Sequence, residues 1–168
     1  MVLETGRLRL REINVEDADF ILRLLNEPSF IQNIADRGVR TTDAARLYIL
    51  NGPIASYLKH GFGLWLVELR EASAPIGICG LIKRDVLDDV DIGYALVPEF
   101  WSQGYAIESA SAVMSFAREA LGLKRVAAIV NPDNHSSIRV LEKIGFRFER
   151  MVRLSDDASE IKLFAADI

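Results

Sequence analysis

Apolar and polar residues follow two periods along this chain, and the period separates the expected strands from the expected helices. Alternating or continuous apolar runs predict strands over residues 7–12, 62–70, 75–84, 92–97, 125–130, 146–154 and 160–165. Apolar residues at helical spacing predict helices over residues 15–26, 41–61, 106–121 and 134–144. The pattern therefore indicates strands and helices mixed along one chain, with strand hairpins on both sides of the long third helix.

Local signals mark the ends of these helices and the character of the first strand. Gly122 follows the third helix, and Gly52 and Pro53 lie inside the second, where they predict a kink or a split. The arginines of residues 7–12 alternate with leucines, and we expect them to form only a solvated face. Capping residues stand before three of the helices, namely Asn14, Thr41 and Asn134.

The order of the elements predicts an α+β fold built on a mixed sheet. One strand and two helices come first, followed by three strands, the long helix, a strand, a helix and two final strands. Such an order gives a run of hairpins with one helix crossing over. The 168 residues, half of them hydrophobic, fit one domain with a substantial core, so we expect residues 1–168 to form a single domain.

The segment over residues 91–121 combines a strand, a turn with a glycine and a long helix. The helix therefore opens its first backbone N–H groups at the carboxyl end of the strand, where they attract phosphate. Gly104 lets a ligand approach the backbone, and Ala106 keeps the following turn small. Backbone geometry alone also explains a glycine at such a turn, so this signal needs support from neighbouring residues.

Charge and composition narrow the classes of partner. The net charge is −4 and no lysine- or arginine-rich run occurs, so a nucleic-acid footprint is missing. The single cysteine, Cys79, excludes an internal disulfide. The chain starts without an apolar signal core and has no run long enough to span a membrane, so we expect a soluble cytoplasmic protein, monomeric or homodimeric.

Three segments of the chain match motifs of a known family. Residues 101–109 read WSQGYAIES and residues 131–146 read NPDNHSSIRVLEKIGF, and the chain also carries ETGRLRLR at residues 4–11. In these motifs the chain resembles the GNAT superfamily of N-acetyltransferases, in particular the RimJ/RimL-like branch of ribosomal-protein N-terminal acetyltransferases. The resemblance implies a mostly antiparallel mixed sheet with helices on both faces and a splayed central strand pair. It also implies that acetyl-coenzyme A lies in the opening between those strands.

The same resemblance assigns the residues that hold the cofactor. Leu96 and Val97 match the backbone beside pantetheine, and Asn134 matches an asparagine near the thiol arm, although a helix cap explains Asn134 equally well. Trp101 departs from the arginine or glutamine common in the family, although tryptophan is usual in the branch that the chain resembles, so helix-terminus amides are expected to carry more of the phosphate binding. The pyrophosphate loop is carried over onto Ser102, Gln103, Gly104, Tyr105 and Ala106.

Two residues are candidates for the chemistry of amine attack on a thioester. Asp91, at the mouth end of the central strand, is the candidate base acting through water, unless it is merely an exposed carboxylate. Ser137 matches a serine that assists the leaving thiolate in the branch, unless it only bonds local backbone. Leu141 stands where many relatives have a tyrosine for that task. Tyr94 and Tyr105 are weaker substitutes, because aromatic packing explains both.

The implied acceptor is a primary amine, and the N-terminal α-amine of a protein or peptide is the first choice. A small amine such as an antibiotic, polyamine or amino acid stays open, as does a non-catalytic acyl-coenzyme A-binding module. Residues 28–61 are expected to form the acceptor wall. Cys79 is disfavoured as an acylated nucleophile because it lies inside an apolar strand, and the scattered cysteine and two histidines predict no metal site.

Overall fold

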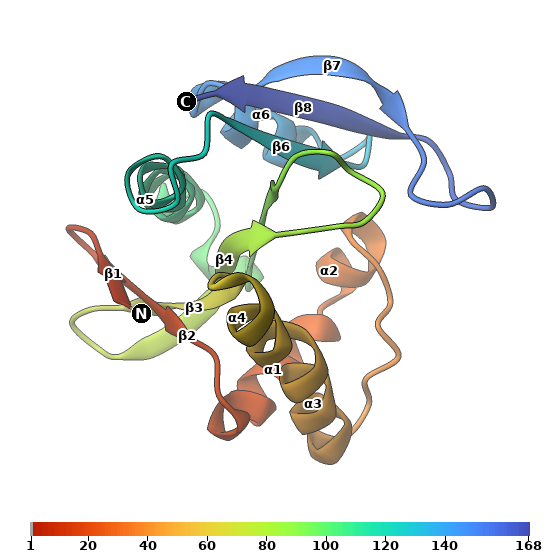
Figure 1. The fold of residues 1–168 in the computed structure, drawn as a ribbon. Coiled ribbons are helices and arrows are strands. Elements are labelled where there is room, and N and C mark those ends of the chain that lie inside the picture. Colours follow the sequence, from red (N-terminus) through yellow and green to blue (C-terminus); the bar gives the residue numbers. More distant parts are fainter. Residues whose placement is uncertain (1) are drawn as a thin grey trace.

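Eight strands form one sheet in the computed structural model, which describes residues 2–168 (Figure 1). The strand order is β1-β2-β3-β4-β5-β6-β8-β7, and every neighbouring pair except β5 and β6 is antiparallel. The strands are β1 Val2–Glu4, β2 Leu8–Glu12, β3 Leu64–Leu69, β4 Ala74–Ile82, β5 Asp91–Leu96, β6 Arg125–Val130, β7 Arg147–Val152 and β8 Ile161–Asp167. The predicted α+β fold with a mostly antiparallel sheet is confirmed.

The helices begin largely where the capping residues predict. Asn14 accepts from the Glu16 amide, Thr41 from the Ala44 amide and Asn134 from the Ser137 amide. The 3-10 turns are η1 Val15–Asp17 and η3 Pro98–Phe100, and the π-helical stretch is η2 Leu50–Ile54. The α-helices are α1 Ala18–Leu25, α2 Pro28–Asn33, α3 Thr42–Ile49, α4 Ala55–His60, α5 Tyr105–Glu119 and α6 His135–Lys143.

Two short elements are absent from the pattern-based expectation. β1 has three residues, too few to show a period, and it is held by its pairing with β2. α2 has Pro28 in its first turn, so a proline that follows the end of α1 also opens the next helix. Neither element changes the order of the strands predicted after it.

The interruption expected inside the helical run over residues 41–61 is a π-helical stretch rather than a break. η2 contains Pro53, which lacks the N–H that a regular helix needs, and α3 and α4 continue on either side. Ala45, Ile49 and Pro53 are buried, whereas Leu47 and Leu58 are 59% and 85% exposed. The run thus buries an alanine, an isoleucine and a proline and leaves these two leucines exposed.

The sheet separates two apolar layers, and alternate residues of β5 belong to different layers. Ile92 and Leu96 pack in the layer that contains α5 and Leu141 of α6. Ala95 and Val97 pack in the layer that contains α1, α2 and α3. Side chains of a strand alternate between faces, so odd-numbered residues of β5 face α1–α3 and even-numbered residues face α5 and α6.

The central strands diverge after a single parallel contact. β4 and β5 are paired over six residues, from Gly77 opposite Leu96 to Ile82 opposite Asp91. β5 and β6 are paired only at Asp91 and Ala127, where the Ala127 amide donates to the Val90 carbonyl. The expected splay is therefore present, and it opens toward the carboxyl ends of β5 and β6, where α5 begins. Among residues 2–168, no helix is long and apolar enough to cross a bilayer.

Candidate active site

The edge of β5 that faces the opening is set by the hydrogen bonds on its other side. The Val97 amide donates to the Ile76 carbonyl at 2.9 Å, so the N–H groups of odd-numbered residues point toward β4. The amides of Tyr94 and Leu96 therefore point toward the opening, beyond the single contact with β6. The two residues predicted beside pantetheine thus differ: Leu96 presents its amide to the opening, whereas the Val97 amide is already bonded.

The predicted pyrophosphate loop is exposed and has an unusual backbone. Ser102 and Gly104 have φ values of 60° and 82°, in the left-handed region, and Gly104 is the N-cap of α5. Ser102, Gln103 and Gly104 are exposed, and the first turn of α5 follows directly. Trp101 anchors the other end of the loop, because its indole Nε1 donates to the Leu96 carbonyl at 2.8 Å. Small residues and free helix-terminus amides leave this loop open to an anion.

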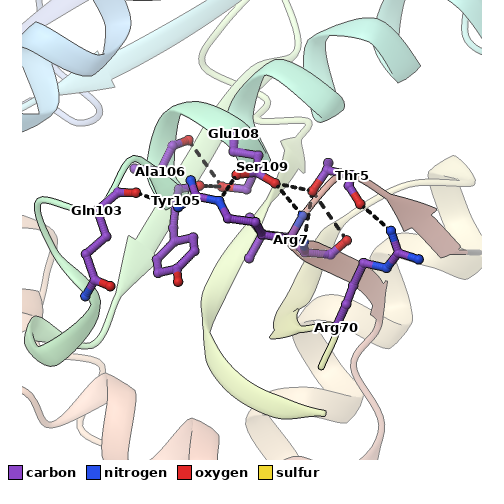
Figure 2. A network of polar contacts seen from close by, with 9 residues as sticks. Thr5, Arg7, Arg70, Gln103, Tyr105, Ala106, Glu108 and Ser109 are labelled. Carbon is purple, nitrogen blue, oxygen red and sulfur yellow. Dashed lines mark hydrogen bonds and ion pairs between the residues drawn. The ribbon is translucent and has the colours of Figure 1, made fainter. Parts of the chain in front are cut away.

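A polar network from the start of the chain supports this loop, as Figure 2 shows. Arg7 donates from Nε to Glu108 at 2.7 Å and from Nη1 to the Gln103 carbonyl at 2.9 Å. Its guanidinium carbon lies 4.3 Å from the centre of the Tyr105 ring. Thr5 also donates to Glu108 at 2.5 Å, and partial burial of Glu108 is outweighed by these hydrogen bonds, which lower its pKa.

The expectation that the arginines of the first strand form only a solvated face is therefore wrong. Arg7 contacts the loop, and Arg11 is clamped between Asp17 at 2.8 Å and Glu68 at 2.9 Å. Arg9 alone fits the expectation, with one exposed ion pair to Glu4. Sequence spacing could not reveal these partners, because they lie up to 101 residues away.

Ser137 has a partner across the opening. The hydroxyl groups of Tyr94, on β5, and Ser137, on α6, lie 2.8 Å apart, and the Tyr94 hydroxyl also donates to the Ser137 carbonyl at 3.0 Å. Burial raises the pKa of Tyr94, so its phenol stays protonated at neutral pH. Tyr94 is thus more than a packing residue. Asn134 caps α6 by accepting from the Ser137 amide at 3.3 Å, the plainer of its two interpretations.

Asp91 is buried, contrary to the alternative of an exposed carboxylate. It is 1% exposed, at the paired end of β5 where the opening starts. Nε of Arg84 donates to both carboxylate oxygens, at 3.1 and 3.3 Å. Burial raises the pKa of Asp91 to about 6, and the nearby charge of Arg84 limits the increase. A carboxyl group with this pKa is ionised at neutral pH but binds a proton readily.

Asp91 and Ser137 lie on opposite sides of the sheet. Asp91 is an odd-numbered residue of β5 and faces α1–α3, whereas Tyr94 points toward α6 and meets Ser137 there. A carboxylate on one face and a hydroxyl pair on the other therefore flank the same opening. Such an arrangement allows a proton to leave an attacking group on one side while a departing group is stabilised on the other.

The remaining candidates lie outside this arrangement. Cys79 is buried in β4, and burial raises the pKa of its thiol to about 12, which makes a thiolate nucleophile unfavourable. Leu141 is a core residue, and His135 is exposed at the start of α6. Within residues 2–168, no three histidine, cysteine, aspartate or glutamate side chains are grouped in a way that could hold a metal ion.

Sequence reasoning missed two residues of this site and ranked a third too low. The pattern placed Arg7 on a solvated face and Arg84 at the end of a strand, and it made Tyr94 only a weaker substitute because aromatic packing explained it. Each is bound to a predicted site residue. The alternation of β5 carries a usable signal, because the period of two residues in a strand is enough to place Asp91 and Tyr94 on opposite faces.

Comparison with known proteins gives consistent matches. The family described as acetyltransferase (GNAT) domain matches residues 7–147. The uncharacterised N-acetyltransferase YoaA of Bacillus subtilis is 33% identical over 153 residues, covering 90% of this chain and 86% of YoaA. An acetyltransferase structure from Agrobacterium tumefaciens has a TM-score of 0.84 at 24% identity, covering 100% of this chain and 95% of the other. The ribosomal L7/L12 alpha-N-protein acetyltransferase RimL, in complex with coenzyme A, has a TM-score of 0.86 at 18% identity, covering 100% and 98%.

Proposed function

Because the chain belongs to the GNAT family and is an acetyl-coenzyme A-dependent N-acetyltransferase, we propose that its acceptor is the N-terminal α-amine of a protein or peptide. The observation that carries the proposal is the placement of Asp91, buried against Arg84 at the start of the opening and on the α1–α3 side. The RimL likeness in fold agrees with this acceptor class. Family membership sets aside the non-catalytic binding module.

The residues around the opening fit acetyl-coenzyme A, which when bound supplies the thioester carbon that an amine attacks. The exposed loop from Ser102 to Ala106 would hold the pyrophosphate through its backbone amides. The Leu96 amide would bond the pantetheine arm along the edge of β5. Asn134 would contact the thiol end of that arm through its side-chain NH₂, since its oxygen already accepts from Ser137.

The strength of Asp91 as a base favours an α-amine over a lysine or polyamine. An α-ammonium group has a pKa of about 8 and a lysine about 10.4. Transfer of a proton to a carboxylate with a pKa of about 6 is therefore uphill by roughly 3 kcal/mol from the first and roughly 6 kcal/mol from the second. At neutral pH about one α-amine in ten is already neutral, against fewer than one lysine in a thousand. A weak buried base is sufficient only for the first acceptor.

Ser137 and Tyr94 would stabilise the departing sulfur. A thiol has a lower pKa than either hydroxyl, so Ser137 would donate a hydrogen bond to the thiolate rather than give up a proton, and Tyr94 would support it through the serine oxygen. When Tyr94 donates to the Ser137 oxygen, the serine hydrogen is free to point into the opening. The proton released by the amine leaves toward Asp91 on the other face.

The proposal is tested by measuring thiol release from acetyl-coenzyme A against four acceptor classes at pH 7. The panel contains peptides with a free N-terminus and no lysine, N-terminally blocked peptides with one lysine, polyamines and aminoglycosides. We expect turnover with the free N-terminus peptides and a loss of that turnover when the same peptides are blocked. Turnover confined to lysine peptides, polyamines or aminoglycosides would contradict the proposed acceptor while leaving the acetyltransferase assignment intact.

A further inference from the structure

Arg7, the residue before β2, contacts the loop of residues 102–106 and the start of α5 at three points. It donates to the carbonyl of Gln103 and to the carboxylate of Glu108, and its guanidinium lies over the ring of Tyr105 (Figure 2). Its Nη2 atom also lies beside Gly104, since a Cβ built on that glycine would stand 3.3 Å from it. One side chain thus reaches the loop and the first turn of α5 together.

The contact with Gln103 fixes the direction of the next amide. In a trans peptide the carbonyl of one residue and the N–H of the next point in opposite directions, and the described residues contain no cis peptide. Because the Gln103 carbonyl points to Arg7, the Gly104 N–H points away from Arg7, toward the open side of the loop. That amide is one of those expected to hold phosphate.

The loop needs an external contact of this kind. The left-handed backbone of Ser102, a residue with a Cβ, costs about 1 kcal/mol, and such conformations persist where neighbouring structure holds them. The rigid fork of a guanidinium satisfies two acceptors at once, whereas an ammonium is a point charge without that geometry. Glu108 neutralises much of the Arg7 charge, so simple attraction of phosphate is the weaker contribution.

We infer that Arg7 is a positioning residue for the pyrophosphate of acetyl-coenzyme A, holding the Gln103–Gly104 peptide so that its N–H faces the phosphate. This role belongs to the cofactor site and does not depend on which amine is the acceptor. It also agrees with the expectation that backbone amides of the loop and of the helix terminus carry the phosphate binding, because Arg7 acts on the direction of one of those amides.

Three variants distinguish a role of Arg7 in orienting the Gln103–Gly104 peptide from simple attraction of phosphate by its charge. Arg7→Met keeps the apolar stem, and Arg7→Lys keeps the charge without the fork. Arg9→Met, two residues along the chain in β2, is the matched control with the same change in charge as Arg7→Met. We expect the Kd for coenzyme A to rise about tenfold in both Arg7 variants and less than about twofold in Arg9→Met. All three should fold, because both arginines form exposed ion pairs that contribute little to stability.

A substrate without phosphates supplies the second readout. We expect kcat/KM for S-acetylpantetheine, which lacks the pyrophosphate, to be the same in the wild type and in Arg7→Met. Normal coenzyme A affinity in Arg7→Lys would overturn the positioning role in favour of charge alone. An equal loss with S-acetylpantetheine and acetyl-coenzyme A would overturn it in favour of general damage to the fold. Both measurements stay informative whichever amine accepts the acetyl group.

Discussion

At the scale of single residues, one hydroxyl pair spans the opening from β5 to α6. Tyr94 can donate either to the carbonyl or to the hydroxyl of Ser137, and only the second choice frees the serine hydrogen. A developing thiolate would favour that choice, because it attracts the serine hydrogen. Tyr94 would therefore act on the leaving group through Ser137 and not by its own contact with the sulfur.

We predict that Ser137→Ala lowers kcat about tenfold, the value of one lost hydrogen bond to a charged group, with a smaller change in KM. Tyr94→Phe should lower kcat less, and the double variant should be no slower than Ser137→Ala, since the two hydroxyls act as one unit. Steady-state kinetics with chemistry shown to be rate-limiting would measure this. Additive losses would mean that the hydroxyls act independently.

Tyr57→Phe is the matched control for this pair. The Tyr57 hydroxyl accepts from the Ile13 amide and donates to the Leu64 carbonyl, away from the opening. Its removal should lower the free energy of unfolding by about 1–3 kcal/mol and leave kcat unchanged.

Asp91 gives a pH dependence whose direction follows from its raised pKa. Between about pH 4 and pH 6 the folded protein holds a proton on Asp91 that the unfolded chain has already released. The contribution of Asp91 to the free energy of unfolding is therefore complete below about pH 4 and is lost as pH rises toward 6, by roughly 3 kcal/mol. Denaturant unfolding at several pH values should show that the free energy of unfolding falls more steeply between about pH 4 and pH 6 in the wild type than in Asp91→Asn. Parallel curves would contradict the raised pKa.

At the scale of elements, β5 has one bonded edge and one open edge. The amide of Val97 is bonded to Ile76 of the chain, whereas the neighbouring amide of Leu96 faces the opening, where β6 has already diverged. The same strand thus provides a structural edge and a binding edge, one residue apart. This division follows from the alternation of N–H directions in an extended backbone.

We predict that coenzyme A slows hydrogen exchange of the Leu96 amide at least about tenfold, because the pantetheine arm would give it a partner. Val97 is the internal control, since its amide is already bonded and should show much less change. Exchange measured by NMR with and without coenzyme A would test this. Protection of Val97 alone would mean that pantetheine lies elsewhere.

At the scale of the whole molecule, the site exists because distant parts of the chain meet at the divergence of β5 and β6. Arg7 reaches Gln103 across 96 residues, and Tyr94 reaches Ser137 across 43. α5 packs against β2, β4 and β5, which brings the start of the chain to the loop. The order of the strands in the sheet thus brings the loop, the hydroxyl pair and Asp91 to one opening.

The sequence by itself determined most of the elements and the position of the loop, because periodicity, capping and proline act within a few residues. It also determined the family, through the motifs on either side of α5. Only the tertiary structure decided that Asp91 is buried against Arg84, that Tyr94 meets Ser137, and that Arg7 supports the loop. These contacts depend on strand order and register, which join residues far apart in the chain and leave no periodic trace in the sequence.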